Sequence, residues 1–221
     1  MMTINRILKL ADFFYSLAKA EELPANSKDL NTILKNIERL ETFNARKKYA
    51  KKNLKKLSSG SSRTAYLTAA NTVIKLAKND KGLAQNKAEA NPLMKSKFVN
   101  KPLRKAKDFI WIEVDYLEKI TEKDFKEMTG IDFGDFDECI RYGLKEVSDN
   151  SDKKPKCFDK VSKTEIYKEL KSIGSKFKLM PGDLAKISSY GSKNGKPILI
   201  DAGLTKEVFD KHYSSSSSSS S

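Results

Sequence analysis

Residues 57–77, LSSGSSRTAYLTAANTVIKLA, mark the point where the pattern of this sequence changes from helix-like to strand-like. Two β-type runs, 64–68 and 72–77, lie close together in it, and alternation in the second places Lys75 opposite Ile74 and Leu76. Further runs of both types follow along the chain. The β-type runs are 109–117 and 197–201, and the helix-like runs are 83–90, 121–128, 135–147 and 163–172. The order predicts an α+β domain.

Upstream of this stretch the periodicity is helical. Residues 4–20, INRILKLADFFYSLAKA, place apolar residues on one face and basic residues largely off it. Such a segment docks on the protein's own core, docks on a partner, or serves as an organelle presequence, and we favour docking. It lacks the apolar core of a secretory signal. We expect Ser27 to cap a second helix that contains Leu30, Ile33, Leu34, Ile37 and Leu40.

The charge is strongly basic. The 221 residues include 43 Lys and Arg against 29 Asp and Glu, a formal net charge of +14. This excess favours anionic partners, or it keeps the surface soluble. Residues 45–56, ARKKYAKKNLKK, contain seven cations and no acid. They form a strip that contacts nucleic-acid phosphates, or a solvated helical face, and the second interpretation is favoured because only Tyr49 interleaves.

Other chemistries are poorly supported by the composition. Cys139, Cys157 and the sole histidine, His212, show no metal-ligand spacing, which argues against zinc and against a Cys/His nucleophile. Two cysteines without a pattern fit a reducing compartment, where they act as small hydrophobic residues. No run of 18 apolar residues predicts a membrane span.

Four ionisable residues stand out by their context. Lys75 lies in a strand, Glu89 in the helix that follows, Asp183 in a polar loop, and Asp201 at the end of the apolar run KPILID. Phosphoryl transfer uses this inventory: a lysine held by a glutamate steadies the nucleotide phosphates, one aspartate handles the acceptor hydroxyl, and another binds magnesium. Taken singly, each residue also fits an ordinary ion pair, cap or turn.

In this order and spacing, residues 57–209 resemble the protein-kinase-like fold, cut short. LSSGSSRTAYLTAANTVIKLA is similar to its glycine-rich hairpin and lysine strand, GDLAKIS to its catalytic loop, and LIDAGL to its magnesium-binding motif. FIWIEVDYL resembles the strand leading to the hinge, which implies that residues 113–116 lie near an adenine position. The sequence also resembles a group of short proteins encoded by bacteriophages. The tracts that carry this resemblance are KLSSGSSR, VIKLAKNDKGLAQN, PGDL, ISSYG and LIDAGLT.

The resemblance implies a nucleotide site made of Lys75, Glu89, Asp201, Ser188 and Gly60, with ATP and Mg²⁺ as ligands, Asp201 on the metal and Asp183 as the vestigial catalytic residue. The sequence departs from the kinase pattern at several points. Gly60 is the one glycine of the hairpin, Ser188 replaces a metal-holding asparagine, and Ala202 follows Asp201 in place of an aromatic residue. Only 12 residues separate Asp201 from the serine tail, so we expect no room for the helices that bind peptide substrate.

A literal Asp-Phe-Gly occurs elsewhere, in IDFGDF at 131–136, but no apolar strand precedes it. We therefore expect a loop and a helix N-cap there, formed by Asp132 or Asp135.

We divide the chain into a basic helical extension (1–57), a kinase-like domain with an antiparallel sheet and a shortened helical second lobe (58–213), and a serine tail (214–221). The favoured hypothesis is a degenerate kinase-like phage protein that acts by binding. It docks on a virion or host assembly through its N-terminal amphipathic helix and binds nucleotide weakly at most. The alternatives are a minimal ATP-dependent phosphotransferase and a basic nucleic-acid-associated protein. We expect it in the host cytoplasm or the phage particle.

Overall fold

The computed structural model describes residues 29–148 and 153–214. The amphipathic segment 4–20 and Ser27 lie outside the described residues. Within the described ranges, no helix combines the length and apolar character needed to cross a membrane.

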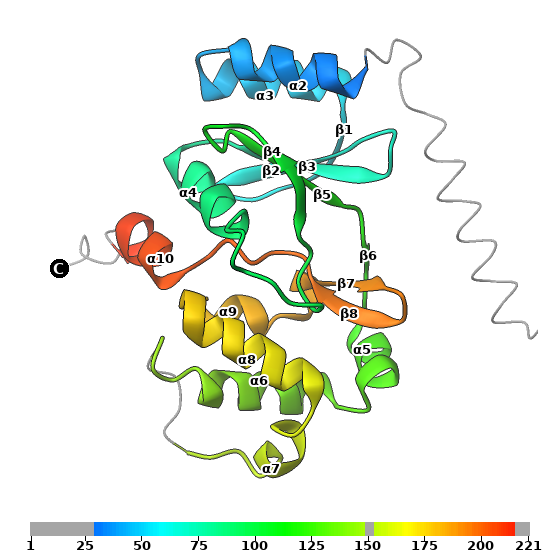
Figure 1. The fold of residues 1–221 in the computed structure, drawn as a ribbon, viewed down its shortest axis with the longest axis vertical. Coiled ribbons are helices and arrows are strands. Elements are labelled where there is room, and N and C mark those ends of the chain that lie inside the picture. Colours follow the sequence, from blue (N-terminus) through cyan, green and yellow to red (C-terminus); the bar gives the residue numbers. More distant parts are fainter. Residues whose placement is uncertain (1–28, 149–152, 215–221) are drawn as a thin grey trace, which may run out of the picture.

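A five-stranded antiparallel sheet forms one half of the molecule (Figure 1). Its spatial order is β1-β2-β3-β5-β4, so consecutive hairpins build most of it. The strands are β1 (Lys55–Ser59), β2 (Arg63–Leu67), β3 (Thr72–Ala77), β4 (Pro102–Lys105) and β5 (Trp111–Asp115). The predicted α+β class is confirmed, and the runs 64–68, 72–77 and 109–117 correspond to β2, β3 and β5.

Two helices, α2 (Leu30–Arg39) and α3 (Phe43–Asn53), cover the face of the sheet that carries Ile74 and Leu76 (Figure 1). Ile33, Leu34 and Ile37 of α2 are buried in one apolar cluster with Tyr66, Ile74 and Trp111. The predicted division at residues 57 and 58 falls inside β1, which pairs with β2. Residues 30–54 therefore share a core with the sheet and are not a separate extension.

The start of α2 differs from the prediction. The helix begins at Leu30 with Asp29 at the N-cap position, and the Asp29 side chain makes no capping hydrogen bond. The first turn is instead held by packing, because Ile33 and Leu34 are almost fully buried. Leu40 lies at the C-cap, one residue beyond the helix.

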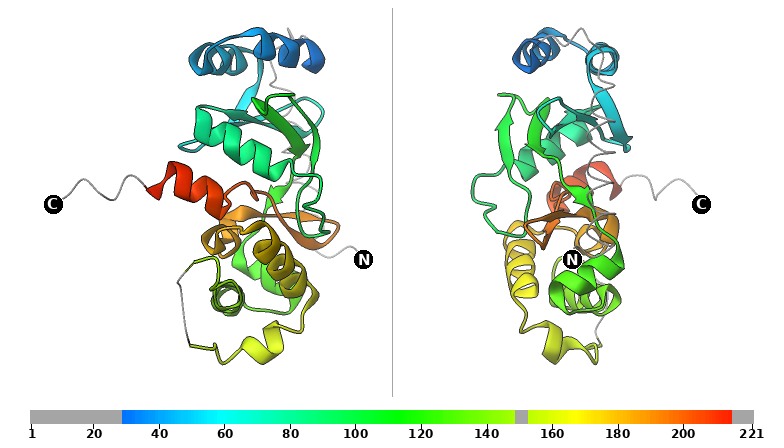
Figure 2. Two further views of the ribbon diagram at one scale, coloured as in Figure 1. Left: turned by 60° about the vertical axis from the view of Figure 1, so that its left-hand side comes forward. Right: turned by 90° about the vertical axis from the view of Figure 1, so that its right-hand side faces the viewer.

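The other half is mostly helical and lies at the opposite end of the molecule from α2 and α3 (Figure 2). Four aromatic rings, those of Phe125, Phe133, Phe136 and Tyr190, pack together at its centre. Its helices are α5 (Glu122–Thr129), α6 (Phe133–Gly143), α7 (Phe158–Val161), α8 (Glu165–Phe177), α9 (Pro181–Leu184), the 3₁₀ helix η1 (Ile187–Ser189) and α10 (Lys206–His212). A small antiparallel sheet completes it, ordered β6 (Glu118–Lys119), β7 (Tyr190–Lys193) and β8 (Lys196–Leu199).

Two smaller predictions concern this half. Asp132 is at the N-cap position of α6, as predicted for IDFGDF, although its side chain pairs with Lys126 and makes no capping hydrogen bond. Cys139 and Cys157 are both free thiols that belong to the apolar core or pack against it, as expected. Their sulfur atoms lie 3.2 Å apart, a contact that their separation in sequence does not reveal.

Candidate functional site

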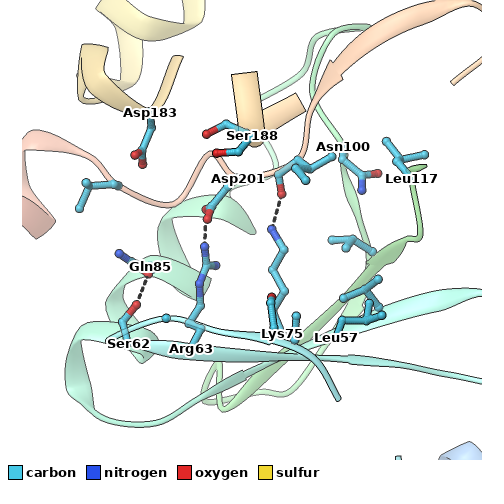
Figure 3. A pocket seen from close by; sticks show the side chains of 18 of the residues that line it. Leu57, Ser62, Arg63, Lys75, Gln85, Asn100, Leu117, Asp183, Ser188 and Asp201 are labelled. Carbon is cyan, nitrogen blue, oxygen red and sulfur yellow. Dashed lines mark hydrogen bonds and ion pairs between the residues drawn. The ribbon is translucent and has the colours of Figure 1, made fainter. Parts of the chain in front are cut away.

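A pocket of about 570 Å³ lies between the five-stranded sheet and the helical half. Its lining comes from the β1–β2 turn, from β2, β3 and β5, and from the segments that contain α9, η1 and Asp201. Figure 3 shows Asp183 and Ser188 on the helical side, across from Lys75 and Arg63 on the sheet. Lys75, Asp183, Ser188, Asp201 and Gly60, five of the six predicted site residues, line this one pocket.

Lys75 reaches the pocket because of strand alternation. Ile74 and Leu76 face α2 and α3 and are at most 1% exposed, so Lys75 faces the other side of β3. Its Nζ donates to Glu89 Oε1 and to the carbonyl oxygen of Ile200. The predicted ion pair between Lys75 and Glu89 is confirmed, and so is the prediction that Asp201 faces the same cleft.

Glu89 is the predicted residue that lies behind the pocket lining. It is the last residue of α4 (Asp80–Glu89), which packs on β3, and its side chain is 1% exposed. The helix begins close to the sheet because Asn79 caps it, with the Gly82 N–H donating to Asn79 Oδ1 at 3.1 Å. The Glu89 carboxylate therefore contacts Lys75 without lining the pocket itself.

Arg63 is the residue that the sequence interpretation missed. Its Nη1 donates to Glu89 Oε2 at 2.7 Å and to Asn86 Oδ1 at 3.1 Å, while Nη2 donates to Asp201 Oδ1 (Figure 3). Burial works against its charge, but the two carboxylates outweigh burial and the pKa of Arg63 is raised above its ordinary value. Strand alternation could have indicated this position. Ala65 pairs with Lys75, so Arg63, two residues before Ala65, lies on the same face of the sheet as Lys75.

The two aspartates have opposite electrostatic environments. Burial by itself would raise the pKa of Asp201, but the charges of Arg63 and Lys75 outweigh it and lower the pKa to about 2. Burial raises the pKa of Asp183 to about 6, and the negative charge of Asp201 adds to the effect. Asp183 lies in the one-turn helix α9, so the predicted polar loop is a helical turn at this point.

The expected adenine position needs one correction. The resemblance implies that residues 113–116 lie near this position, but Glu113 pairs with Ile74 and therefore faces α2 and α3. Its carboxylate accepts from Arg104 and Thr72 and is 5% exposed. Residues 114–117 do line the pocket. Because side chains alternate along a strand, Glu113 and Val114 face opposite sides of β5, and of these two only Val114 lines the pocket.

Near residues 114–117 the pocket wall is apolar. Leu57, Ala65, Val73, Val114 and Leu117 line it. Two backbone groups nearby already have partners: the carbonyl oxygen of Asp115 accepts from Asn100 Nδ2 at 2.9 Å, and the Tyr116 N–H donates to the Asn71 carbonyl at 3.2 Å. The wall can therefore bury a flat apolar group.

A magnesium site is poorly matched by these residues. Mg²⁺ prefers several oxygen ligands in octahedral geometry, but one oxygen of Asp201 accepts from Arg63. Burial raises the pKa of Asp183 to about 6, so the pocket stabilises the charged form of this carboxylate less than water does. Within residues 29–148 and 153–214, no three Asp, Glu, His or Cys side chains converge at one place.

The basic strip is partly exposed. Residues 43–53 form α3, and Lys47, Lys48, Lys51 and Lys52 are exposed on it. Tyr49 is half-buried, and its hydroxyl accepts from Asn36 Nδ2 at 2.8 Å, so it packs against α2. Nucleic-acid binding through residues 45–56 stays a prediction, without a stacking tyrosine to support it.

Comparisons with family models and curated proteins find no match for this chain. A scan of protein-family models gives no match to this chain, and a search of curated proteins gives no significant relative.

Proposed function

We propose that this is a kinase-like protein of bacteriophage type that binds a nucleotide in the pocket between its two halves and acts by binding rather than by phosphoryl transfer. The observation that supports it best is the set of charges in the pocket. Lys75, held by the buried Glu89, faces a cavity that Asp183 and Asp201 enter from the opposite side. The apolar wall beside residues 114–117 suits an adenine ring, and a volume of about 570 Å³ suits a ligand of nucleotide size.

The same contacts argue against efficient transfer. Phosphoryl transfer depends on metal ions that bridge the phosphates and on an aspartate that accepts the proton of the acceptor hydroxyl. Here the Asp201 carboxylate is paired with Arg63. In addition, Ser188 stands where the kinase pattern has an asparagine that holds metal. Losing such electrostatic positioning lowers rates by about two to three orders of magnitude per group. We therefore expect weak nucleotide binding and no transfer to generic protein substrates.

Equilibrium binding of a fluorescent ATP analogue to the full chain tests this proposal. Lys75→Met removes the phosphate-facing charge while Arg63 still pairs with Glu89, and should weaken binding about tenfold or more, since charge-assisted contacts to phosphate are strong. Lys101→Met, on an exposed residue outside the pocket, is the matched control and should bind as the wild type does. Equal loss in both variants, or unlabelled ATP failing to displace the probe, would contradict a nucleotide site.

A minimal phosphotransferase is the second candidate, and one observation favours it. A pKa of about 6 for Asp183 lies near the range useful for a general base at neutral pH. Magnesium-dependent transfer from ATP by the purified protein, abolished by both Asp183→Asn and Asp201→Asn, would place this candidate first.

A further inference from the structure

The guanidinium of Arg63 occupies the centre of the charge cluster. Its side chain is 8% exposed, whereas the side chain of Asp201, with which it pairs, is 49% exposed. Arg63 is anchored on the buried side by Glu89 and Asn86 and extends toward the open side of the pocket. The cation therefore lies between a buried carboxylate and a carboxylate that a ligand can approach.

The charges of the four ion-paired side chains balance without a metal. Arg63 and Lys75 carry two positive charges, and Glu89 and Asp201 carry two negative charges. A divalent cation at Asp201 would lie beside two fixed cations and would compete with Arg63 for this carboxylate. Displacing Arg63 would take a hydrogen-bonding partner from Glu89, which is 1% exposed, and such losses are costly in a buried site.

A phosphate group, unlike a divalent cation, would be attracted by Arg63 and Lys75. Hydrogen bonds to the described residues use only part of the planar donor set of Arg63, and Lys75 adjoins it on the next strand. A guanidinium binds phosphate oxygens in pairs, and it also screens the negative charge of Asp201 from them. The pocket thus presents two cationic donors, Arg63 and Lys75, to a phosphate group.

We propose that Arg63 takes the place of the metal ion, so that Arg63 and Lys75 bind the phosphate groups of the nucleotide directly and no divalent cation is required. This inference rests on the proposed nucleotide binding. It also assigns Arg63, the first residue of β2, as the principal specificity residue for phosphorylated ligands.

The test measures binding of the fluorescent ATP analogue to the full chain in excess EDTA and in excess MgCl₂. For the wild type, we expect dissociation constants that agree within about twofold, since the site gains nothing from the metal. Arg63→Met should lose about tenfold or more of the affinity in EDTA, and magnesium should restore part of it because Asp201 is then unpaired.

Two further variants keep the test decisive if Arg63→Met folds poorly. Asp201→Asn retains Arg63 and removes a negative charge beside the phosphates, so binding in EDTA should tighten about threefold to tenfold. Arg104→Met is the matched control, because Arg104 also pairs with a buried carboxylate, that of Glu113, but lies outside the pocket lining. It should leave the affinity of the probe unchanged in both buffers.

The outcomes separate the two proposals. Binding that requires magnesium and is lost in Asp201→Asn would overturn the role of Arg63 while leaving nucleotide binding intact. No binding in either buffer would overturn the nucleotide site and the inference with it. Metal-independent binding that is weakened by Arg63→Met and not by Arg104→Met would support both.

Discussion

At the scale of single residues, the pocket is organised around Glu89. Its carboxylate accepts from Lys75 through one oxygen and from Arg63 through the other, and only 1% of the side chain is exposed. Two cations and one carboxylate are stable together in such a place only while every partner is present. Glu89 therefore holds both phosphate-facing cations, although it does not line the cavity itself.

Replacing Glu89 by glutamine should lower the free energy of unfolding by about 3–5 kcal/mol, because Lys75 would lose its counter-charge and Arg63 would lose one of its two. Urea unfolding monitored by circular dichroism measures the change. The matched control is Glu165→Gln, which breaks a pair with Lys97 whose side chains are 61% and 45% exposed. That control should unfold like the wild type, and equal effects of the two substitutions would show that burial of Glu89 is unimportant.

Asp183 predicts a dependence of stability on pH. Its folded pKa of about 6 lies above the usual aspartate value, so its contribution to stability is complete at low pH and is lost as the pH rises through about 6. Because the group is partly accessible to solvent, we expect a loss of about 1–2 kcal/mol between about pH 4 and pH 7.

Asp183→Asn should abolish that part of the pH dependence. The measurement is the difference in unfolding free energy between the wild type and the variant at a series of pH values. The difference should fall as the pH rises. A constant difference across the range would mean that Asp183 titrates as an ordinary exposed aspartate.

At the scale of elements, the position of α4 against the sheet decides where Glu89 lies. The helix approaches the strands closely at Gly82, where a Cβ atom would come within 2.3 Å of the Ser62 carbonyl oxygen and 3.0 Å of Ala77 Cα. Both are backbone atoms, which cannot move aside as a flexible side chain can. Glycine is thus required at this position by packing rather than by backbone conformation.

Gly82→Ala should destabilise the protein by about 1–3 kcal/mol, although alanine favours a helix, because the clash outweighs the gain in propensity. Thermal unfolding provides the measurement. Gly134→Ala in α6 is the matched control, since nothing lies within 4 Å of the place that its added methyl group would occupy. The control should be neutral or stabilised by up to about 1 kcal/mol, and equal stabilisation of both variants would contradict the close packing of α4.

At the scale of the whole molecule, α2 and α3 belong to the same core as the sheet. Ile37 is fully buried in the cluster that includes Tyr66, Ile74 and Trp111. A polar contact joins the same elements, with Trp111 Nε1 donating to Glu38 Oε1 at 3.0 Å. We therefore expect the helices to unfold together with the sheet.

Ile37→Ala should lower the free energy of unfolding by about 2–5 kcal/mol, the usual cost of a cavity in a core. Fluorescence of Trp111, which is the only tryptophan and lies in the sheet, should report the shifted transition together with circular dichroism. Leu93→Ala is the control, because Leu93 is 65% exposed. A helical signal that shifts while the tryptophan signal does not would identify α2 and α3 as an independent unit.

Local periodicity was enough to predict several elements of this fold from the sequence. Alternation located β2, β3 and β5 and turned Lys75 toward the pocket, because every second side chain of a strand faces the same side. Helical periodicity located α4, α5, α6 and α8. The order of the charged residues led to the prediction that Lys75, Glu89 and Asp201 belong to one nucleotide site. Short polar elements such as β4, β6 and α9 were missed, since neighbouring elements rather than their own sequences stabilise them.

Contacts between distant segments could not be predicted from the sequence and became clear only from the folded structure. Arg63 and Asp201 are 138 residues apart, and nothing in either local pattern specifies that they pair. The register of β5 against β3 turned Glu113 away from the pocket, and the packing of Ile33 and Ile37 on the sheet joined α2 to the core. These outcomes depend on burial and charge balance in the assembled fold, and those quantities exist only once the distant segments meet.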